Sequence, residues 1–184
     1  MNVLRIGAED TKLNPASNEK LVTKMPQPTS VRKRPKTVQV IVNPASGRRL
    51  PLLQTLNQHF RPYGIHWQVT VTHQTGDGAR AAKRAVQDGV DLIMTWGGDG
   101  TIMDVAEGLV QTDTPLLILS GGTGNVVAAE LDLPRDIDKA LSLITGDHFQ
   151  TRSVDVGRMG HRHFMLRIGC GFETGVIQDA TREM

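Results

Sequence analysis

The sequence predicts an α/β fold in three layers, a parallel sheet with helices on both faces, followed by the start of an antiparallel β lobe. From Thr37 to about His148, short apolar segments alternate with segments of helical spacing, as parallel sheets with crossover helices require. Three of the apolar segments run into glycine-containing loops. After Phe149 the helical spacing stops, which predicts the antiparallel part.

The first elements follow from composition and period. Residues 37–42 predict a strand because valine and isoleucine dominate this segment. Residues 50–63 carry leucine and phenylalanine at helical spacing and predict a helix. Residues 65–72 alternate apolar and polar side chains, which is typical of a second strand with one buried face.

The next elements repeat this order. Residues 78–88 are rich in alanine and stop at Gly89, which predicts a helix. The apolar run 90–95 predicts the third strand and residues 102–110 the third helix. Residues 115–119 are continuously apolar and predict the fourth strand, buried on both faces.

Four further elements complete the series. Residues 126–131 and 136–145 have helical spacing of apolar side chains. Residues 149–159 and 162–168 predict two strands joined by a turn at Gly160-His161. We therefore expect two units beyond the N-terminal segment, a nucleotide-binding domain over residues 37–148 and the incomplete start of a β-rich lobe over residues 149–184.

Residues 1–36 are predicted to form a flexible basic tail. They contain four prolines, few large apolar side chains and no steady period. The run Arg32-Lys33-Arg34-Pro35-Lys36 lies at the end of this tail. Two interpretations stay open, a solvated arm or a peripheral contact with an anionic membrane surface.

Composition excludes several classes of protein. The net charge is +2 and resides in the tail, and only 4% of the residues are aromatic, so we expect no nucleic-acid partner. One cysteine, Cys170, rules out an internal disulfide framework. The sequence shows no long apolar run and no secretory signal, so we expect a cytoplasmic protein. The histidines show no metal-ligand spacing apart from His161 and His163, which we interpret as a surface pair.

The three glycine-containing loops, at residues 43–47, 97–101 and 120–125, all follow strands. Because ligands bind beyond the carboxyl ends of parallel strands, these loops should converge on one site. Glycine backbone N–H groups and the start of a helix are typical of a phosphate site. Asp99 would there hold Mg²⁺, orient a loop or accept a proton from an attacking hydroxyl.

Each candidate residue also has a structural interpretation. Asn43 can form an Asn-Pro turn, and Thr123 or Asn125 can cap a helix. Thr72 ends a strand at the same edge, where β propensity explains it as well as a contact with phosphate or ribose does. Asp104 can complete a capping box or face the phosphates through a metal ion. Glu107 is interpreted as a solvated or helix-pairing charge.

Together these loops resemble the diacylglycerol kinase catalytic domain family of lipid kinases. The resemblance rests on Asn43-Pro44-Ala45-Ser46-Gly47, Gly97-Gly98-Asp99-Gly100-Thr101-Ile102 and Gly122-Thr123-Gly124-Asn125, and it extends to Val154-Asp155-Val156-Gly157 and Gly169-Cys170-Gly171-Phe172-Glu173. It implies a nucleotide-binding lobe like that of the diacylglycerol and NAD kinases. It also implies ATP-dependent phosphorylation of a lipid hydroxyl, with ATP and Mg²⁺ as cofactors and a lipid as the second substrate.

The loop chemistry and the resemblance together give one set of site residues. Asp99 is the catalytic candidate, and the metal ligands stay unassigned. The nucleotide-binding candidates are Asn43, Ser46, Gly47, Thr72, Gly97, Gly98, Asp99, Gly100, Thr101, Ile102, Met103, Asp104, Gly122, Thr123, Gly124 and Asn125.

The sequence departs from the family pattern at Asp104, where the family usually has glutamate, and at Ser120-Gly121 and Val126. The resemblance further implies a general base and Mg²⁺ ligands in a second lobe, beyond Met184. We therefore expect a lipid kinase or its nucleotide-binding lobe. The alternatives are an NAD kinase-like enzyme and a non-catalytic nucleotide-binding module.

Overall fold

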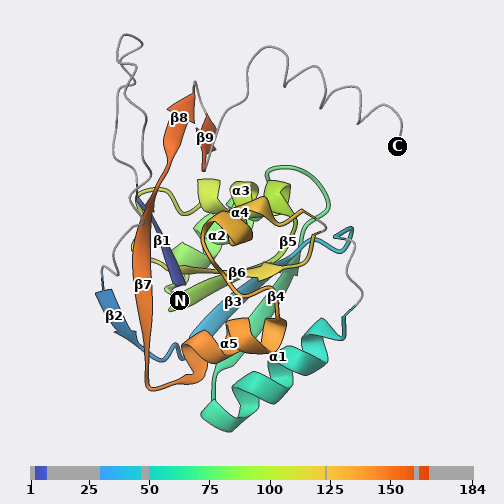
Figure 1. Ribbon diagram of the computed structural model, residues 1–184, viewed down its shortest axis with the longest axis vertical. Coiled ribbons are helices and arrows are strands. Elements are labelled where there is room, and N and C mark those ends of the chain that lie inside the picture. The colour runs from blue at the N-terminus through green and yellow to red at the C-terminus, as the bar shows by residue number, and fades with distance from the viewer. Residues whose placement is uncertain (1–2, 8–29, 47–49, 123, 160–161, 166–184) are drawn as a thin grey trace.

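A central sheet divides the molecule into three layers, as the sequence predicts (Figure 1). The structure is a computed structural model, and it describes residues 3–7, 30–46, 50–122, 124–159 and 162–165. Within these residues seven strands form the main sheet in the order β2-β7-β1-β6-β5-β3-β4. In the same part of the chain no helix is long and apolar enough to cross a membrane.

The four predicted strands form a parallel block. They are β3 (Thr37–Val42), β4 (His66–Val71), β5 (Leu92–Gly97) and β6 (Leu116–Ser120). β3 pairs with β4 on one side and with β5 on the other, and β5 pairs with β6, all in parallel. β5 and β6 are buried along their whole length because helices cover both of their faces.

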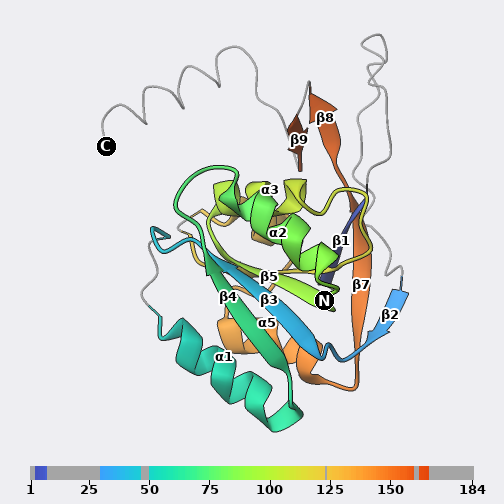
Figure 2. The same ribbon diagram turned by 180° about the vertical axis from the view of Figure 1, so that it is seen from behind.

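Three helices cover one face of the sheet (Figure 1 and Figure 2). They are α2 (Asp77–Gln87), α3 (Asp99–Glu107) and α4 (Val126–Glu130). Their apolar sides share one buried cluster with alternate residues of the strands, among them Ile41, Ile93 and Ile118. α3 begins at Asp99, earlier than the predicted residue 102, so residues 99–101 of the predicted loop already belong to the first turn of this helix.

Two helices cover the opposite face. α1 (Leu52–Phe60) continues into a 3₁₀ turn at Arg61–Tyr63, and α5 (Ile137–Thr145) begins at Asp136, whose carboxylate accepts a hydrogen bond from the Lys139 N–H. Leu56, Phe60 and Leu141 belong to the buried cluster on this side. Both faces of the sheet are therefore covered, and the predicted three-layer fold is confirmed.

The N-terminal segment is not wholly a tail. β1 (Val3–Gly7) lies between β7 (His148–Asp155) and β6, parallel to the first and antiparallel to the second. β2 (Ser30–Lys33) pairs antiparallel with β7. The prediction of a flexible tail is wrong for these two strands, because segments of four or five residues are too short to show a period and are fixed by their place in the sheet. Residues 8–29 of the predicted tail lie outside the described residues.

The boundary of the β lobe also differs from the prediction. The segment 149–159 is not one strand, since β7 belongs to the main sheet and a second strand, β8 (Gly157–Met159), leaves it. β8 pairs antiparallel with β9 (Arg162–Phe164), which confirms the predicted hairpin. Strand period alone could not reveal that β7 finds its partners in β1 and β2. The predicted turn at Gly160-His161 and residues 166–184 lie outside the described residues.

Candidate functional site

An open cleft of about 1180 Å³ lies at the carboxyl ends of the parallel strands. All three predicted loops contribute to it, so their convergence on one edge is found in the structure. The candidates that line it are Asn43, Ser46, Thr72, Gly98, Asp99, Gly100, Thr101, Met103, Asp104, Gly122 and Gly124. The candidates Gly97, Ile102 and Asn125 do not line it, and Gly47 and Thr123 lie outside the described residues.

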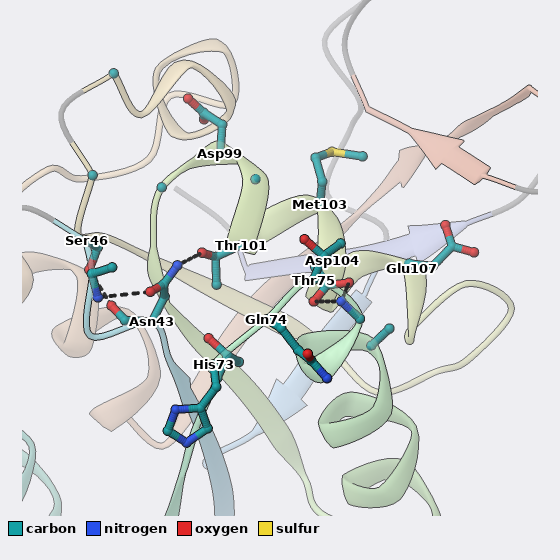
Figure 3. Close-up of a pocket in the computed structure, with 18 of the residues that line it drawn as sticks. Asn43, Ser46, His73, Gln74, Thr75, Asp99, Thr101, Met103, Asp104 and Glu107 are labelled. Atoms are coloured by element: carbon teal, nitrogen blue, oxygen red, sulfur yellow. Dashed lines mark hydrogen bonds between the residues drawn. The ribbon is translucent and has the colours of Figure 1, made fainter. Parts of the chain in front are cut away.

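Asn43 ties the first loop to α3. Its side-chain amide donates to Thr101 Oγ1 at 3.0 Å, and its side-chain oxygen accepts from the Ala45 N–H at 3.0 Å. Figure 3 shows Asn43 and Thr101 facing one another across the cleft floor. The Ser46 hydroxyl donates to the Asn43 carbonyl at 2.7 Å and closes the predicted Asn-Pro turn. Asn43 and Ser46 thus form this turn and also line the cleft.

The hydroxyl of Thr72 is already engaged at the edge of the sheet. It donates to the Val42 carbonyl at 3.3 Å, and the residue is 8% exposed. Thr72 is also among the residues that line the cleft, and a hydroxyl that donates one hydrogen bond can still accept others. Thr72 therefore serves the strand pairing and the cleft wall at once.

Asp99 joins two helices. Its Oδ2 accepts from the Val126 N–H at 3.1 Å and its Oδ1 from the Val127 N–H at 2.9 Å, so the carboxylate caps α4 from the first turn of α3. A carboxylate engaged through both oxygens fixes the start of α4 next to the 122–125 loop. Of the three roles predicted for Asp99, these contacts match the orientation of a loop.

The 120–125 loop is closed by its own residues. Asn125 adopts φ 50° and its side-chain oxygen accepts from the Gly122 N–H at 3.1 Å, while its amide donates to the Gly122 carbonyl at 2.6 Å. Asn125 is 6% exposed, so it shapes the loop from behind the cleft wall. Asn125 occupies the N-cap position of α4, but its side chain bonds to Gly122 and makes no capping hydrogen bond, so it has a structural role other than the predicted helix cap.

Two glycine contacts bring the loops together. A Cβ at Gly122 would lie 2.6 Å from the Gly98 Cα, and a Cβ at Gly97 would lie 2.5 Å from the Thr101 Cβ. A side chain at either position would separate β5, α3 and the loop after β6. A Cβ at Gly100, in the first turn of α3, meets nothing within 4 Å, so that position opens onto the cleft.

The start of α3 presents unpaired hydrogen-bond donors to this opening. Gly98 is its N-cap residue and, as a glycine, has no side chain with which to cap the helix. The first backbone N–H groups of an α-helix have no partner within the helix, and the helix dipole adds positive potential. The cleft therefore offers an anion-binding corner formed by residues 98–101.

Asp104 lies on the other side of the cleft. Its carboxylate accepts from the Gly76 N–H at 3.0 Å and from the Gly78 N–H at 2.8 Å, at the start of α2. It neither completes a capping box of its own helix nor lies free in the cleft. The loop that it contacts, residues 73–76, lines the cleft but was not among the predicted site residues.

The sequence contained a signal for this loop. Thr75-Gly76-Asp77-Gly78 follows β4 and begins a helix, as the predicted glycine loops follow their strands. Asp77 accepts from the His73 and Gln74 N–H groups at 2.8 and 3.0 Å. These backbone hydrogen bonds, above all that from His73, lower the pKa of Asp77 below its ordinary value.

Glu107 and His163 close the far end of the cleft, and both were assigned to the surface from the sequence. Glu107 accepts from the His163 N–H at 2.9 Å, and its Oε1 lies 3.0 Å from His163 Nδ1. Burial alone would raise the pKa of Glu107, but the hydrogen bonds from His163 outweigh it and hold that pKa below its ordinary value. The pair attaches the β8–β9 hairpin to α3.

A dedicated metal site is not assembled from these side chains. Among the described residues no three His, Cys, Asp or Glu side chains gather in metal-binding geometry. Asp99, Asp104 and Glu107 instead accept N–H hydrogen bonds. Mg²⁺ in nucleotide sites is often held by one or two carboxylates and by the substrate phosphates. The three carboxylates among the described residues that line the cleft are all engaged by N–H donors.

The chain resembles known lipid kinases over most of its length. Residues 37–159 match the model of the diacylglycerol kinase catalytic domain. A diacylglycerol kinase of Bacillus subtilis is 35% identical over 155 residues, which cover 81% of this chain and 50% of that protein. One of Staphylococcus haemolyticus is 35% identical over 134 residues, which cover 71% of this chain and 40% of that protein.

A solved structure shares the fold. The crystal structure of a diacylglycerol kinase from Bacillus anthracis superposes with a TM-score of 0.60 at 30% identity, covering 72% of this chain and 47% of that one. The chain thus spans about half the length of the curated relatives it matches, 50% and 40% in the two named above.

Proposed function

The chain belongs to the diacylglycerol kinase catalytic domain family, and from this membership we propose that it is an ATP-dependent lipid kinase or the nucleotide-binding lobe of one. In the proposed reaction the γ-phosphate of ATP passes to a lipid hydroxyl. The observation that carries the proposal is the anion-binding corner at the start of α3, open to a cleft of about 1180 Å³.

In the proposed mechanism this lobe binds and orients the nucleotide. The N–H groups at residues 98–101 bind phosphate oxygens, since donors fixed in place before the reaction stabilise charge without reorganising. Asp99 keeps the start of α4 and the adjoining loop at the phosphates, and the Asn43–Thr101 hydrogen bond keeps the first loop there. ATP supplies the transferred phosphoryl group when bound.

The use of Mg²⁺ stays a prediction that rests on the family. The described residues do not assemble its site, so no step is derived through the metal ion. The general base for the lipid hydroxyl is likewise unassigned among the residues of the cleft.

One observation favours a second candidate, a non-catalytic nucleotide-binding module. The carboxylates that line the cleft, Asp99, Asp104 and Glu107, all accept N–H hydrogen bonds. Carboxylates held by backbone donors in this way support the shape of a binding site. The NAD kinase-like alternative shares the glycine-aspartate motif. It differs from the lipid kinase in the molecule that accepts the phosphoryl group, which is NAD instead of a lipid.

The test is binding and transfer of labelled ATP. We expect the wild-type chain to bind ATP, and label from γ-labelled ATP with Mg²⁺ to appear in diacylglycerol or a sphingoid base and not in NAD. Binding without transfer supports the non-catalytic module, and label in NADP supports the NAD kinase-like alternative. A wild-type chain that binds no ATP contradicts all three of these candidate functions.

Gly122→Ala supplies a site-specific variant for this test. The added Cβ would lie 2.6 Å from the Gly98 Cα, so the two loops must separate and ATP binding should fall by about tenfold or more. Gly146→Ala is the matched control, because its Cβ would lie 3.5 Å from the nearest atom, the His148 carbonyl oxygen, away from the cleft. Equal ATP affinity of the two variants would remove residues 98 and 122 from the proposed site.

The contact of the basic run with an anionic membrane also stays a prediction. Arg32 donates to the Asp113 carbonyl at 2.7 Å, and Arg34 pairs with Asp147 and stacks on the Tyr63 ring at 4.6 Å. Two of the basic side chains are therefore engaged within the protein. In the proposed contact, Lys33 and Lys36 are the other basic residues of the run whose side chains would bind an anionic membrane.

A further inference from the structure

We propose that Asp104 is a positioning residue, which fixes the loop of residues 73–76 as a wall of the nucleotide cleft and does not bind a metal ion or phosphate itself. The inference rests on the proposed function, because it concerns how this cleft holds a nucleotide. It also gives a role to the position at which the chain departs from the usual glutamate of the family.

The contacts of Asp104 are directed at backbone groups. Both carboxylate oxygens lie 3.0 Å from the Gly76 nitrogen, and Oδ2 accepts from the Gly78 N–H at 2.8 Å. These N–H groups belong to the N-cap and the first turn of α2, where the helix dipole is positive. The N-terminal end of α2 therefore stabilises the negative charge of Asp104.

Gly78 leaves room for this carboxylate because it has no side chain. A Cβ at Gly78 would lie 2.8 Å from Asp104 Oδ2 and 3.1 Å from Val105 Cγ2, so a side chain there would displace the carboxylate. Gly76 has φ +90°, which favours glycine. Because the carboxylate already lies against the backbone, the shorter aspartate suits this position.

A second carboxylate holds the other end of the loop. Asp77 accepts from the N–H groups of His73 and Gln74, while Asp104 reaches the loop from α3. Residues 73–76 all line the cleft, and Figure 3 labels Gln74, Thr75 and Asp104 among the side chains of this pocket. Asp77 of α2 and Asp104 of α3 thus both hold the loop that forms this wall.

The charge of Asp104 separates the possible roles. A free carboxylate in the cleft would repel a triphosphate, so its removal would strengthen ATP binding. A metal ligand would matter only when Mg²⁺ is present. A carboxylate that positions the loop supports binding under both conditions, and its removal weakens binding with and without Mg²⁺.

The experiment measures the dissociation constant of ATP for the full chain, with and without Mg²⁺. For Asp104→Asn we expect a loss of affinity of about tenfold under both conditions, the order of magnitude for one charged hydrogen bond. Asp88→Asn is the matched control, because Asp88 is an exposed acid at the far end of α2. Equal or tighter binding by Asp104→Asn, or a loss confined to Mg²⁺, overturns the inference.

Gly78→Ala tests the same contact without changing the charge. We expect it to weaken ATP binding in wild type, and by several-fold less in an Asp104→Ala background, because the displaced carboxylate is then already gone. Additive losses in the double variant overturn the inference. Hydrogen exchange at Gly76 and Gly78 should quicken in Asp104→Asn while the amides of β5 stay protected, which shows that the variant remains folded.

The outcomes also separate this inference from the proposed function. Failure of the wild-type chain to bind ATP contradicts the function, and the inference falls with it. Binding of ATP by wild type and by Asp104→Asn with equal affinity contradicts the inference alone.

Discussion

Three carboxylates of one helix each organise a different wall of the cleft. Asp99 accepts from α4, Asp104 from the start of α2, and Glu107 from His163 in β9. All three carboxylates accept hydrogen bonds from backbone N–H groups. The positions of these donors are set by the fold and do not change with a side-chain rotamer. At the residue scale, α3 therefore serves as the support to which the other walls of the site are attached.

Asp99→Ala should impair the site more than the fold. The variant leaves the Val126 and Val127 N–H groups without their acceptor, which releases the start of α4 and the adjoining loop. We expect ATP affinity to fall by at least about tenfold, the order of magnitude for the loss of charged hydrogen bonds. Titration of ATP with the purified variant measures this.

Asp136→Ala is the control for this variant. Asp136 caps α5 on the opposite face of the sheet, through the Lys139 N–H, so its removal costs a helix cap without touching the cleft. Its thermal stability should fall while ATP affinity is retained. Loss of affinity of the same size in both variants would show that Asp99 acts only through stability.

At the element scale, the strand that the sequence did not predict is among the best buried. Val3, Leu4 and Ile6 of β1 are at most 1% exposed, and the backbone of β1 bridges β7 and β6. Without β1 the edge of β6 would lose its partner and β7 would lose its connection to the sheet. Deleting the first residues would thus remove a core strand together with the predicted tail.

Leu4→Ala should destabilise the protein by about 2–5 kcal/mol, the usual cost of truncating a fully buried leucine. Val31→Ala, in β2, is the matched control because Val31 is 66% exposed, and its effect should stay within about 0.5 kcal/mol. Urea unfolding of both variants measures the difference. An effect of Leu4→Ala as small as that of Val31→Ala would show that β1 contributes little to the folded state.

At the scale of the whole molecule, the cleft and the basic run lie at opposite ends of the sheet. The run precedes the first residue of β3, whereas the cleft begins after its last residue, Val42. A strand of this length spans about 20 Å at roughly 3.3 Å per residue. A membrane bound by Lys33 and Lys36 would therefore lie on the side away from the nucleotide.

The β8–β9 hairpin provides a pH-dependent contact with the cleft. The pKa of Glu107 is lowered in the folded protein from 4.5, so the stability that its bonds to His163 contribute is present above about pH 4.5 and is lost as pH falls through the lowered pKa. We expect Glu107→Gln to lower the melting temperature at pH 7 and to have a smaller effect near pH 3. Thermal unfolding at both pH values measures this.

Asp88→Asn again supplies the comparison, since its exposed carboxylate makes only a long contact of 3.9 Å with Arg84. Its effect on the melting temperature should be small at both pH values. An effect of Glu107→Gln that is equally large at pH 7 and pH 3 would exclude the carboxylate as its source.

Local pattern was sufficient for most of the fold. The four parallel strands and the five helices were predicted near their observed positions, because burial of one face imposes a period on the sequence and burial of both faces of a strand imposes a continuous apolar run. The cleft was predicted from glycine loops that follow strands, and eleven of its lining residues were among the candidates. Loop 73–76 was missed although Gly76-Asp77-Gly78 has the same character, and the Glu107–His163 pair joins residues with no local relation.

The sequence by itself determined the three-layer architecture, the family and the edge at which the loops meet, since each of these depends on spacing along the chain. Only the tertiary structure decided that β1 enters the sheet, that β7 belongs to it, and what Asp99 and Asp104 contact. The physical reason is that the role of a carboxylate depends on which groups donate hydrogen bonds to it. For Asp99 and Asp104 these are backbone N–H groups about 27 residues away in the chain, which no pattern of side chains reveals.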